Sequence, residues 1–290
     1  MQRRSHIQLL IDALKLSRFN NLIIIFLTQY AGAIFLFNPD QPLIFVLGDL
    51  RFFILVVSTV VIAAAGYYIN DYYDIKIDLI NKPDRVIVGN TIKRRPVMIA
   101  HTTLNAIGIL LGALISLWIG IIHLVCAFLL WWYSNQLKRW PFVGNFVVAL
   151  LTGTTLLVLL AFYRSMNLLV VTYAFFAFGI TLIREIIKDI EDVEGDASYG
   201  GQTLPVIFGV RRTKVILFVI IALIISSLVI FLLKVQNQYL LYYFGTLAIP
   251  FFYFLIRLLR ADTKKHFAYL SSYCKWLIIA GILSMVFLKF

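Results

Sequence analysis

Residues 213–233 read TKVILFVIIALIISSLVIFLL, and Lys214 is the one charged side chain in this stretch. As a helix it would be about 30 Å long, close to the thickness of the hydrocarbon core of a bilayer. Similar stretches recur along the 290 residues, of which 61% are apolar and 14% are charged. A soluble globular domain does not have this composition, and a membrane β-barrel would show shorter segments of alternating polarity. The sequence therefore predicts an all-α membrane protein.

Apolar stretches bounded by charged or turn residues predict a bundle of nine transmembrane helices. They cover residues 20–37, 51–69, 97–118, 121–137, 144–163, 168–187, 213–233, 239–258 and 273–289. Nine crossings place the two termini on opposite sides of the membrane and make residues 1–290 a single transmembrane domain. The turn between the third and fourth spans is expected at Ile119-Gly120-Ile121, which no charge marks.

The first nineteen residues differ from the spans because they are amphipathic. Ile7, Leu10, Ile11 and Leu14 follow the i, i+3, i+4, i+7 pattern, and Lys and Arg flank them. This pattern is typical of a helix that lies in the membrane interface. Residues 1–19 are therefore expected to form an interfacial amphipathic helix rather than a cleaved signal peptide.

The basic residues indicate how the bundle is oriented. Sorted by the predicted spans, 22 of the 26 Lys and Arg residues fall on the side of the N-terminus, and the other four are Arg51, Arg164, Lys234 and Lys289. Short cytoplasmic loops carry such an excess, so the N-terminus is expected to be cytoplasmic in a multi-pass protein of the cell membrane. The net charge of +12 fits this orientation and anionic partners, so no nucleic acid needs to be invoked.

Carboxylates also gather on the predicted cytoplasmic face, where orientation does not explain them. Ten of the 14 acidic residues lie in two clusters, at 71–84 and 185–196. We expect the segments that carry them, 70–96 and 188–212, to be cytoplasmic active-site loops. Each cluster has aspartates at relative positions 0, 3 and 7, and these are Asp71, Asp74 and Asp78 in the first and Asp189, Asp192 and Asp196 in the second.

On a helix these offsets place three carboxylates within about 60° of one another. Three like charges repel, so a cation is expected to compensate for them. Oxygen ligands without His or Cys suit a hard ion such as Mg²⁺, which binds one or two carboxylates together with substrate phosphate oxygens. The two rows therefore predict a magnesium site that clamps a diphosphate. A helix that ends at Gly195 would leave Asp196 in the following loop.

Two readings compete with a metal site. Charged clusters at a membrane surface are often solvated loop residues, although a repeated spacing makes this reading weaker here. Acidic residues inside membrane segments also form ion pathways in secondary transporters. These acids lie at the ends of spans rather than in the middle, which disfavours a transporter.

The acidic motifs carry a family resemblance. Asn70 to Asp78 match N-D-x-x-D-x-x-x-D, and Asp192 and Asp196 match D-x-x-x-D. In these motifs, and in the number of spans, the chain resembles the UbiA superfamily of intramembrane prenyltransferases. Residues 184–196, followed by Thr203-Leu204-Pro205, are most similar to its geranylgeranylglycerol-phosphate geranylgeranyltransferase branch. The chain departs from the family pattern at Phe19 and Val86, where proline is common, and in having four residues instead of three between Tyr133 and Lys138.

The resemblance implies a Mg²⁺-dependent prenyltransferase. It would transfer a geranylgeranyl-like chain from an allylic isoprenoid diphosphate to the hydroxyl of a lipid-soluble acceptor, a prenylated glycerol phosphate, at the bilayer surface. All six aspartates would act as catalytic metal ligands. The expected substrate-binding residues are Asn21, Tyr67, Asn70, Arg85, Tyr133, Lys138 and Lys188. Among them the cations suit diphosphate oxygens, and tyrosine faces suit an allylic cation.

Other functions remain open at this stage. An aromatic-acceptor prenyltransferase of quinone biosynthesis and a terpene cyclase of the same superfamily would use the same aspartates. A CDP-alcohol phosphotransferase also uses membrane aspartates, but its Asp-Gly-x-x-Ala-Arg continuation is absent from the sequence. A secondary transporter is the non-enzymatic alternative.

Overall fold

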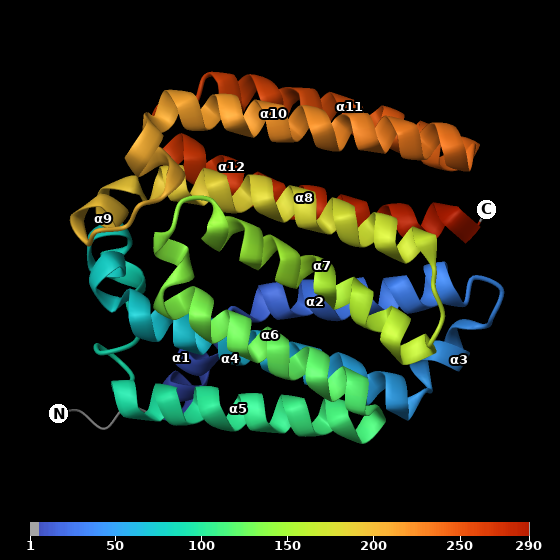
Figure 1. Ribbon diagram of the computed structural model, residues 1–290, viewed down its shortest axis with the longest axis horizontal. Coiled ribbons are helices and arrows are strands. Elements are labelled where there is room, and N and C mark those ends of the chain that lie inside the picture. The colour runs from blue at the N-terminus through green and yellow to red at the C-terminus, as the bar shows by residue number, and fades with distance from the viewer. Residues whose placement is uncertain (1–5, 290) are drawn as a thin grey trace.

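The computed structural model describes residues 6–289, and this part of the chain is helical without a β-sheet (Figure 1). Within it, nine helices are long and apolar enough to cross a membrane, which confirms the predicted number. They are α2 with its continuation (Phe19–Phe37), α4 (Leu50–Asn81), α5 (Arg94–Ile115), α6 (Leu117–Asn135), α7 (Val143–Tyr163), α8 (Leu168–Glu191), α10 (Leu204–Val235), α11 (Gln238–Leu259) and α12 with its continuation (Lys264–Lys289).

Three shorter helices lie at the ends of this bundle. They are α1 (His6–Leu16), α3 (Leu43–Leu47) and α9 (Val193–Ser198). Helices α1 and α9 lie at one end, on the left of Figure 1, whereas α3 and the C-terminal residues lie at the other. Helix α1 covers residues 6–16 of the segment expected to form an interfacial helix, and residues 1–5 lie outside the described part of the chain.

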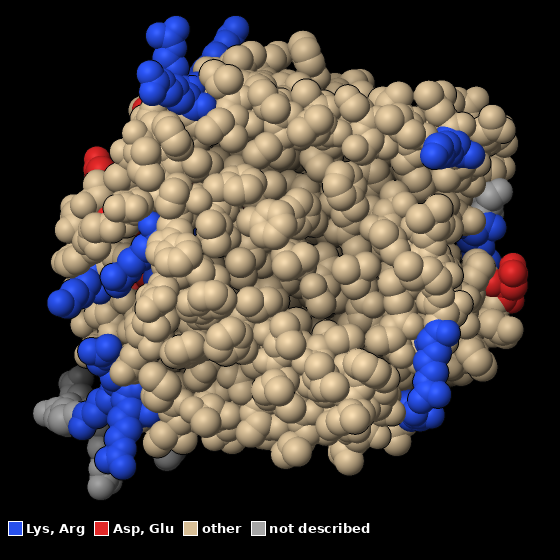
Figure 2. Space-filling view, viewed as in Figure 1, with Lys and Arg blue, Asp and Glu red and all other residues tan. Residues whose placement is uncertain are grey.

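The surface of the bundle is divided by polarity. Figure 2 shows Lys, Arg, Asp and Glu at the two ends of the helices, with a broad uncharged band between them. Within this band large apolar side chains such as Leu114, Leu223 and Ile249 are exposed. An apolar belt between two charged rims is the surface that a bilayer requires, and the chain is accordingly a multi-pass membrane protein.

Several helix boundaries differ from the prediction. The break between the third and fourth spans lies at Ser116, whose backbone is extended (φ −163°), and not at residues 119–121. Helix α12 begins at Lys264, nine residues before the predicted span. Basic side chains near its start had marked the span end, but long basic side chains at a helix end can extend to the polar interface without interrupting the helix. Helix α10 begins at Leu204, but the non-helical backbone of Gly209 (φ 77°, ψ 159°) kinks it, so its uninterrupted part starts close to the predicted residue 213.

The segments expected as active-site loops are also partly helical. Residues 70–81 belong to the last three turns of α4, so the first aspartate row lies on the helix itself. Residues 193–198 form α9, and from Leu204 the chain is again helical. True loop structure in these segments is confined to the residues around Val86–Lys93 and Tyr199–Thr203.

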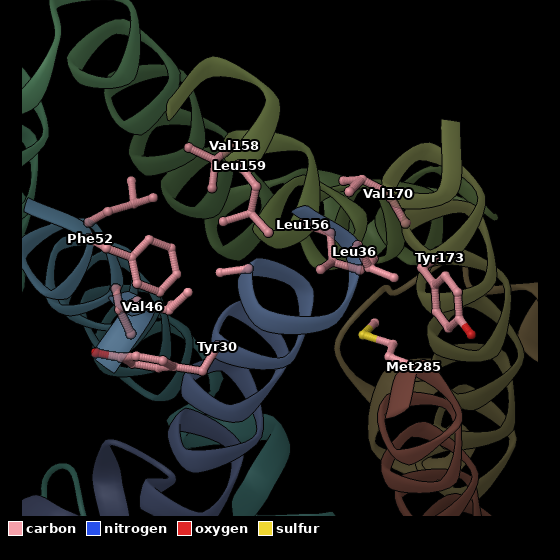
Figure 3. Close-up of a cluster of buried hydrophobic side chains, with 14 of the residues drawn as sticks. Tyr30, Leu36, Val46, Phe52, Leu156, Val158, Leu159, Val170, Tyr173 and Met285 are labelled. Atoms are coloured by element: carbon pink, nitrogen blue, oxygen red, sulfur yellow. The ribbon is translucent and has the colours of Figure 1, made fainter. Parts of the chain in front are cut away.

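A buried apolar cluster holds the helices together at the end of the bundle away from α9. It brings together Tyr30 of α2, Phe52 of α4, Leu156 of α7, Tyr173 of α8 and Met285 at the C-terminal end (Figure 3). Phe52 packs edge-on against Tyr30, with ring centroids 5.1 Å apart. A second cluster packs α8 against α10, α11 and α12. These contacts fix α4 and α8 relative to one another, which positions the acidic ends of both helices.

Candidate active site

The first aspartate row extends from the polar end of α4. Because α4 is continuous to Asn81, Asp71, Asp74 and Asp78 share one face as their spacing predicted. Asn70 donates a hydrogen bond from Nδ2 to Oδ2 of Asp74 at 2.8 Å, which fixes the orientation of that carboxylate.

The second row is divided between two helices. Helix α8 ends at Glu191, Asp192 is the junction, and α9 begins at Val193. The break therefore comes at Asp192, three residues before Gly195, and Asp196 lies on α9 rather than in a loop. This bend turns Asp192 and Asp196 toward the end of α4, where Lys82 donates a hydrogen bond to the Asp192 carboxylate.

Five of the six aspartates bond to side chains from other parts of the sequence or from the adjoining turn. Arg18 lies 2.9 Å from Asp71, Lys82 lies 2.7 Å from Asp192, and Lys138 forms an ion pair with Asp74. Asn145 donates to Asp189 at 2.8 Å, and Thr203 donates to Asp196 at 3.3 Å. Each carboxylate is thus held in place by a donor, and each cation lies beside the acidic rows.

Asn81 joins the two acidic segments through its side chain and its backbone. Its Nδ2 donates to the backbone oxygen of Asp192 at 3.0 Å, and its Oδ1 accepts from the backbone N–H of Gly195 at 3.1 Å. Its own backbone oxygen accepts from Lys264 at 2.9 Å. A Cβ atom at Gly195 would collide with the Asn81 amide, so this close approach requires glycine. The end of α4, α9 and the start of α12 are consequently held together.

The carboxylates of the two segments act on one another electrostatically. Burial, together with the charges of Asp192 and Asp74, raises the pKa of Asp196 to about 6, against the hydrogen bond from Thr203. Asp74 lies on α4 and Asp196 on α9, so the two rows are close enough for their charges to interact. Lys82 compensates for part of this charge: burial would lower its pKa, but Asp192 raises it above its ordinary value.

The donor set fits a hard divalent ion. It consists of carboxylate oxygens, with no His or Cys among the aspartate rows, and the Oδ1 atom of Asp192 is buried without a hydrogen-bond partner in the described structure. Within the described residues no three His, Cys, Asp or Glu side chains converge as a ready-made ligand set. The carboxylates are instead turned toward Arg18, Lys82, Lys138, Asn145 and Thr203. A metal bound there would therefore need some of these side chains to reorient, or would bind together with a phosphorylated ligand.

A cavity of about 340 Å³ begins at these aspartates and continues between the helices. Its polar end is lined by both rows, and its deeper part by apolar side chains such as Ile62, Leu130, Ile180 and Met285. Asp189 and Tyr173, both lining residues, are sixteen positions apart on α8, which corresponds to roughly 24 Å of helix. The cavity thus combines an anionic, cation-flanked mouth with a long apolar interior.

Most of the predicted site residues line this cavity. They are Asn21, Tyr67, Asn70, Asp74, Asp78, Tyr133, Lys138, Lys188, Asp189, Asp192 and Asp196. Asp71 is not a lining residue, although its partner Arg18 is. The side chain of Arg85 lies outside the part of the chain that the structure describes. Asn21 donates to the Tyr67 hydroxyl at 3.3 Å, so these two residues are in contact at the mouth.

Several residues at the site were not assigned to it from the sequence. Arg18 stacks over the Tyr67 ring at 4.9 Å while it pairs with Asp71, and Lys82, Asn81 and Asn145 hold the second acidic row. Each of them reaches its partner from a distant part of the sequence or across a helix end. The sequence contains one indication of such residues, a polar side chain such as Asn145 near the start of an apolar span. A buried asparagine needs a hydrogen-bond partner, so its position indicates a polar contact nearby.

Comparison with known proteins identifies the family. The model of the UbiA prenyltransferase family matches residues 25–281. The chain belongs to this family. Its likeness to individual UbiA proteins extends over most of its length, and both acidic motifs fall within the matched region.

Curated relatives in the family include archaeal digeranylgeranylglyceryl phosphate synthases. The chain is 36% identical to the synthase of Methanosphaera stadtmanae over 214 residues, which cover 73% of this chain and 78% of the relative. It is 36% identical to the synthase of Methanothermobacter thermautotrophicus over 208 residues, covering 70% of each chain.

Solved structures of UbiA proteins have the same fold. One of a digeranylgeranylglyceryl phosphate synthase aligns with a TM-score of 0.68 and 26% identity over 96% of this chain and 98% of that one. A UbiA homologue of Archaeoglobus fulgidus, solved with DMAPP and Mg²⁺, aligns with a TM-score of 0.63 and 20% identity over 95% of this chain and 99% of that one. These matches confirm the predicted UbiA-type helical bundle.

Proposed function

We propose that this UbiA prenyltransferase joins a geranylgeranyl-like chain to the hydroxyl of a prenylated glycerol phosphate and releases diphosphate. The observation that carries the proposal is the single cavity whose mouth is lined by aspartates of α4 and of α8–α9 and whose interior is apolar. An allylic diphosphate has a charged head that matches the polar mouth of the cavity and an isoprenoid tail that matches its apolar interior. The names of the archaeal relatives support a glycerol phosphate acceptor.

The aspartates and their neighbouring cations would bind the diphosphate. Mg²⁺ held by Asp71, Asp74, Asp78, Asp189, Asp192 and Asp196 would neutralise charge on the diphosphate oxygens and thereby favour their departure. Arg18, Lys82 and Lys138 already lie beside these carboxylates and can donate charge-assisted hydrogen bonds to the same oxygens. Arg85 remains a proposed diphosphate ligand, and Lys188 lines the same mouth.

The reaction exchanges one carbon–oxygen bond for another. The bond between the allylic carbon and the diphosphate oxygen breaks, and both electrons leave with diphosphate. The acceptor hydroxyl oxygen forms the new ether bond, and its proton passes to the released diphosphate. Tyr67 and Tyr133 line the cavity between the aspartates and its apolar interior, where ring faces can stabilise the developing allylic cation without attacking it.

The isoprenoid tail would extend along α8 toward Tyr173 and Met285. About 24 Å of helix separates the acidic mouth from this end, which accommodates a chain of several isoprene units. The exclusion of water from an apolar interior would protect the allylic cation from hydrolysis.

We also propose that the acidic mouth faces the cytoplasm in the cell membrane. The excess of basic residues at the end of the bundle that holds α1 and α9 supports this orientation.

Purified protein supplied with Mg²⁺, labelled allylic diphosphates and a panel of acceptors tests the function. Mass spectrometry should detect an ether product with a prenylated glycerol phosphate, and none with 4-hydroxybenzoate or a naphthoate. Prenylation of an aromatic acceptor alone would assign the enzyme to quinone biosynthesis. Release of diphosphate with a cyclic hydrocarbon product would assign it to the terpene cyclases. Ion-coupled flux of an unmodified substrate would favour a transporter.

A further inference from the structure

A second cavity, of about 430 Å³, lies beside the first between the ends of α4 and α8 and the start of α12. We call it the basic pocket. Its polar lining contains six cationic side chains, Lys82, Arg184, Lys188, Lys264, Lys265 and Lys275, and two acidic ones, Asp84 and Glu191. The sequence prediction assigned only Lys188 among these cations to substrate binding.

One face of α12 supplies half of these cations. Residues 264, 265, 268, 271, 272 and 275 line the pocket and lie within roughly 120° around the helix. Ser271 and Ser272 add hydroxyl groups between the lysines. The pocket also includes the first turn of α12, whose backbone N–H groups favour an anion. The lining is therefore rich in donors and has few acceptors.

The positive charge of the pocket is only partly neutralised by the described protein. Arg184 and Lys188 share the single carboxylate of Glu185, and Lys82 lies 2.7 Å from Asp192 and 3.7 Å from Glu191. Lys264 donates to a backbone oxygen, and no acidic side chain of the described residues pairs with Lys265 or Lys275. In addition, Nε of Arg184 is buried without a hydrogen-bond partner in the described structure. Clustered cations repel one another, so an anionic ligand would relieve this repulsion.

The basic pocket and the candidate active site share a wall. Arg184, Lys188 and Lys275 line both cavities, and Lys82 lines the basic pocket while it pairs with Asp192 of the acidic mouth. An anion in the basic pocket would therefore lie next to a diphosphate bound by the aspartates, but would be separated from it by these side chains.

We propose that the basic pocket binds the phosphate monoester of the acceptor, an inference that rests on the proposed function. In a prenylated glycerol phosphate, the phosphate and the free hydroxyl are attached to one three-carbon skeleton. Anchoring the phosphate on α12 would therefore hold the hydroxyl close to the side chains that line both cavities. An acceptor without phosphate would leave the cations of the pocket unneutralised, so the pocket would select phosphorylated acceptors.

The decisive variant is Lys265→Glu, because Lys265 has no acidic partner among the described residues and lines the basic pocket but not the candidate active site. Lys15→Glu is the matched control, since it reverses the charge of an exposed lysine that lines neither cavity. The KM for each substrate should be measured, using a prenylated glycerol phosphate and its dephosphorylated counterpart as acceptors. Melting temperatures check that both variants fold.

The first variant should raise the KM for the phosphorylated acceptor about tenfold or more, because charge-assisted hydrogen bonds are lost. It should leave the KM for the allylic diphosphate within about twofold and should reduce the preference for the phosphorylated over the dephosphorylated acceptor. The control variant should retain the wild-type KM for both substrates. An unchanged acceptor KM, or an equal rise for both substrates, would overturn the proposal.

Equilibrium binding of glycerol 1-phosphate to the detergent-solubilised protein separates this proposal from the proposed function. Binding should be lost in Lys265→Glu and kept in the control. If glycerol 1-phosphate binds in this way but no acceptor is prenylated, the proposed function fails and the phosphate site stands. If transfer proceeds and the variant behaves as wild type, the phosphate site alone is wrong. Equal competition by phosphatidylglycerol in nanodiscs would identify a general site for bilayer lipids and overturn the assignment to the acceptor.

Discussion

Donors from distant parts of the chain hold the aspartates of the two motifs. Arg18, Lys138 and Asn145 come from helices or turns that neither motif belongs to, yet each bonds to one of its carboxylates. Such partners fix the direction in which a carboxylate points before any ligand binds. We therefore expect that substitution of the aspartates, or of the residues that hydrogen-bond to them, lowers turnover.

Replacing Asp192 by Ala should lower kcat by roughly 100-fold or more, because it would remove a proposed metal ligand and leave Lys82 without its main partner. The neighbouring Glu194 is exposed and lines neither cavity, so Glu194→Gln is the control and should retain wild-type turnover. Steady-state rates at saturating substrate, with melting temperatures for both variants, make the comparison. Turnover of Asp192→Ala within about twofold of wild type would place this residue outside the chemistry.

The Asn145→Ala variant tests a residue that orients a carboxylate rather than binding the metal or the substrate itself. Without the 2.8 Å hydrogen bond from its amide, the half-buried Asp189 carboxylate loses its donor, and activity should fall roughly tenfold to 100-fold. A shift of the Mg²⁺ concentration required for half-maximal rate should accompany this loss. Asn90→Ala, at an exposed position, should change neither quantity. A rate loss with an unchanged Mg²⁺ requirement would contradict the orienting role.

The motif spacings in the sequence were sufficient to find the aspartates but not the residues that hydrogen-bond to them. Asp71, Asp74 and Asp78 could be grouped because helical periodicity relates residues a few positions apart. The pairing of Arg18 with Asp71 spans 53 positions, and that of Lys82 with Asp192 spans 110. Such pairs depend on how helices pack, which no local pattern encodes. The helix break at Asp192 was likewise missed, because Gly195 was a more obvious helix terminator.

At the scale of elements, the end of α4 and the short helix α9 form one unit through Asn81. Its amide bonds to backbone groups at both ends of the turn that carries Asp192. The span count was predictable because nine apolar stretches are separated by polar segments. The start of α12 was not, because basic side chains near a helix end are compatible with both helix and loop. The short helical turn of α10 that precedes the kink at Gly209 was not predictable from the span pattern either.

Gly195→Ala should separate α9 from α4, since the added Cβ would collide with the Asn81 amide. We expect a loss of about 1–3 kcal/mol in stability and a marked fall in turnover, because Asp192 and Asp196 move together with α9. Gly245→Ala, at which a Cβ meets open space, is the matched control. Thermal unfolding and rate measurements test both. A variant with unchanged rate would show that α9 need not be held against α4.

The depth of the cavity should limit the length of the isoprenoid chain. Ala177 lines the apolar interior on α8, two turns below Arg184, so Ala177→Phe would obstruct the deeper part. The ratio of kcat/KM for geranylgeranyl over geranyl diphosphate should fall about tenfold. Ala222→Phe, on the exposed face of α10, should leave the ratio unchanged. An unchanged ratio in Ala177→Phe would mean that the tail follows another path.

At the scale of the whole molecule, the bundle separates an apolar interior from a charged rim at one end. The cavity extends across this boundary, with aspartates at the rim and apolar residues between the helices. Two apolar clusters fix α4, α7, α8 and α12 around it, so the two acidic segments are held at one opening. The architecture thus supports the binding of a single diphosphate by both segments.

Binding calorimetry with a non-reactive allylic diphosphate analogue tests this central claim most directly. The analogue should bind to the wild-type protein with Mg²⁺ and much more weakly after chelation of the metal. Asp74→Asn on α4 and Asp192→Asn on the α8–α9 junction should each weaken the Mg²⁺-dependent binding about tenfold or more, because both segments contribute to one site. Wild-type affinity in either variant, or equal affinity with and without Mg²⁺, would contradict the account.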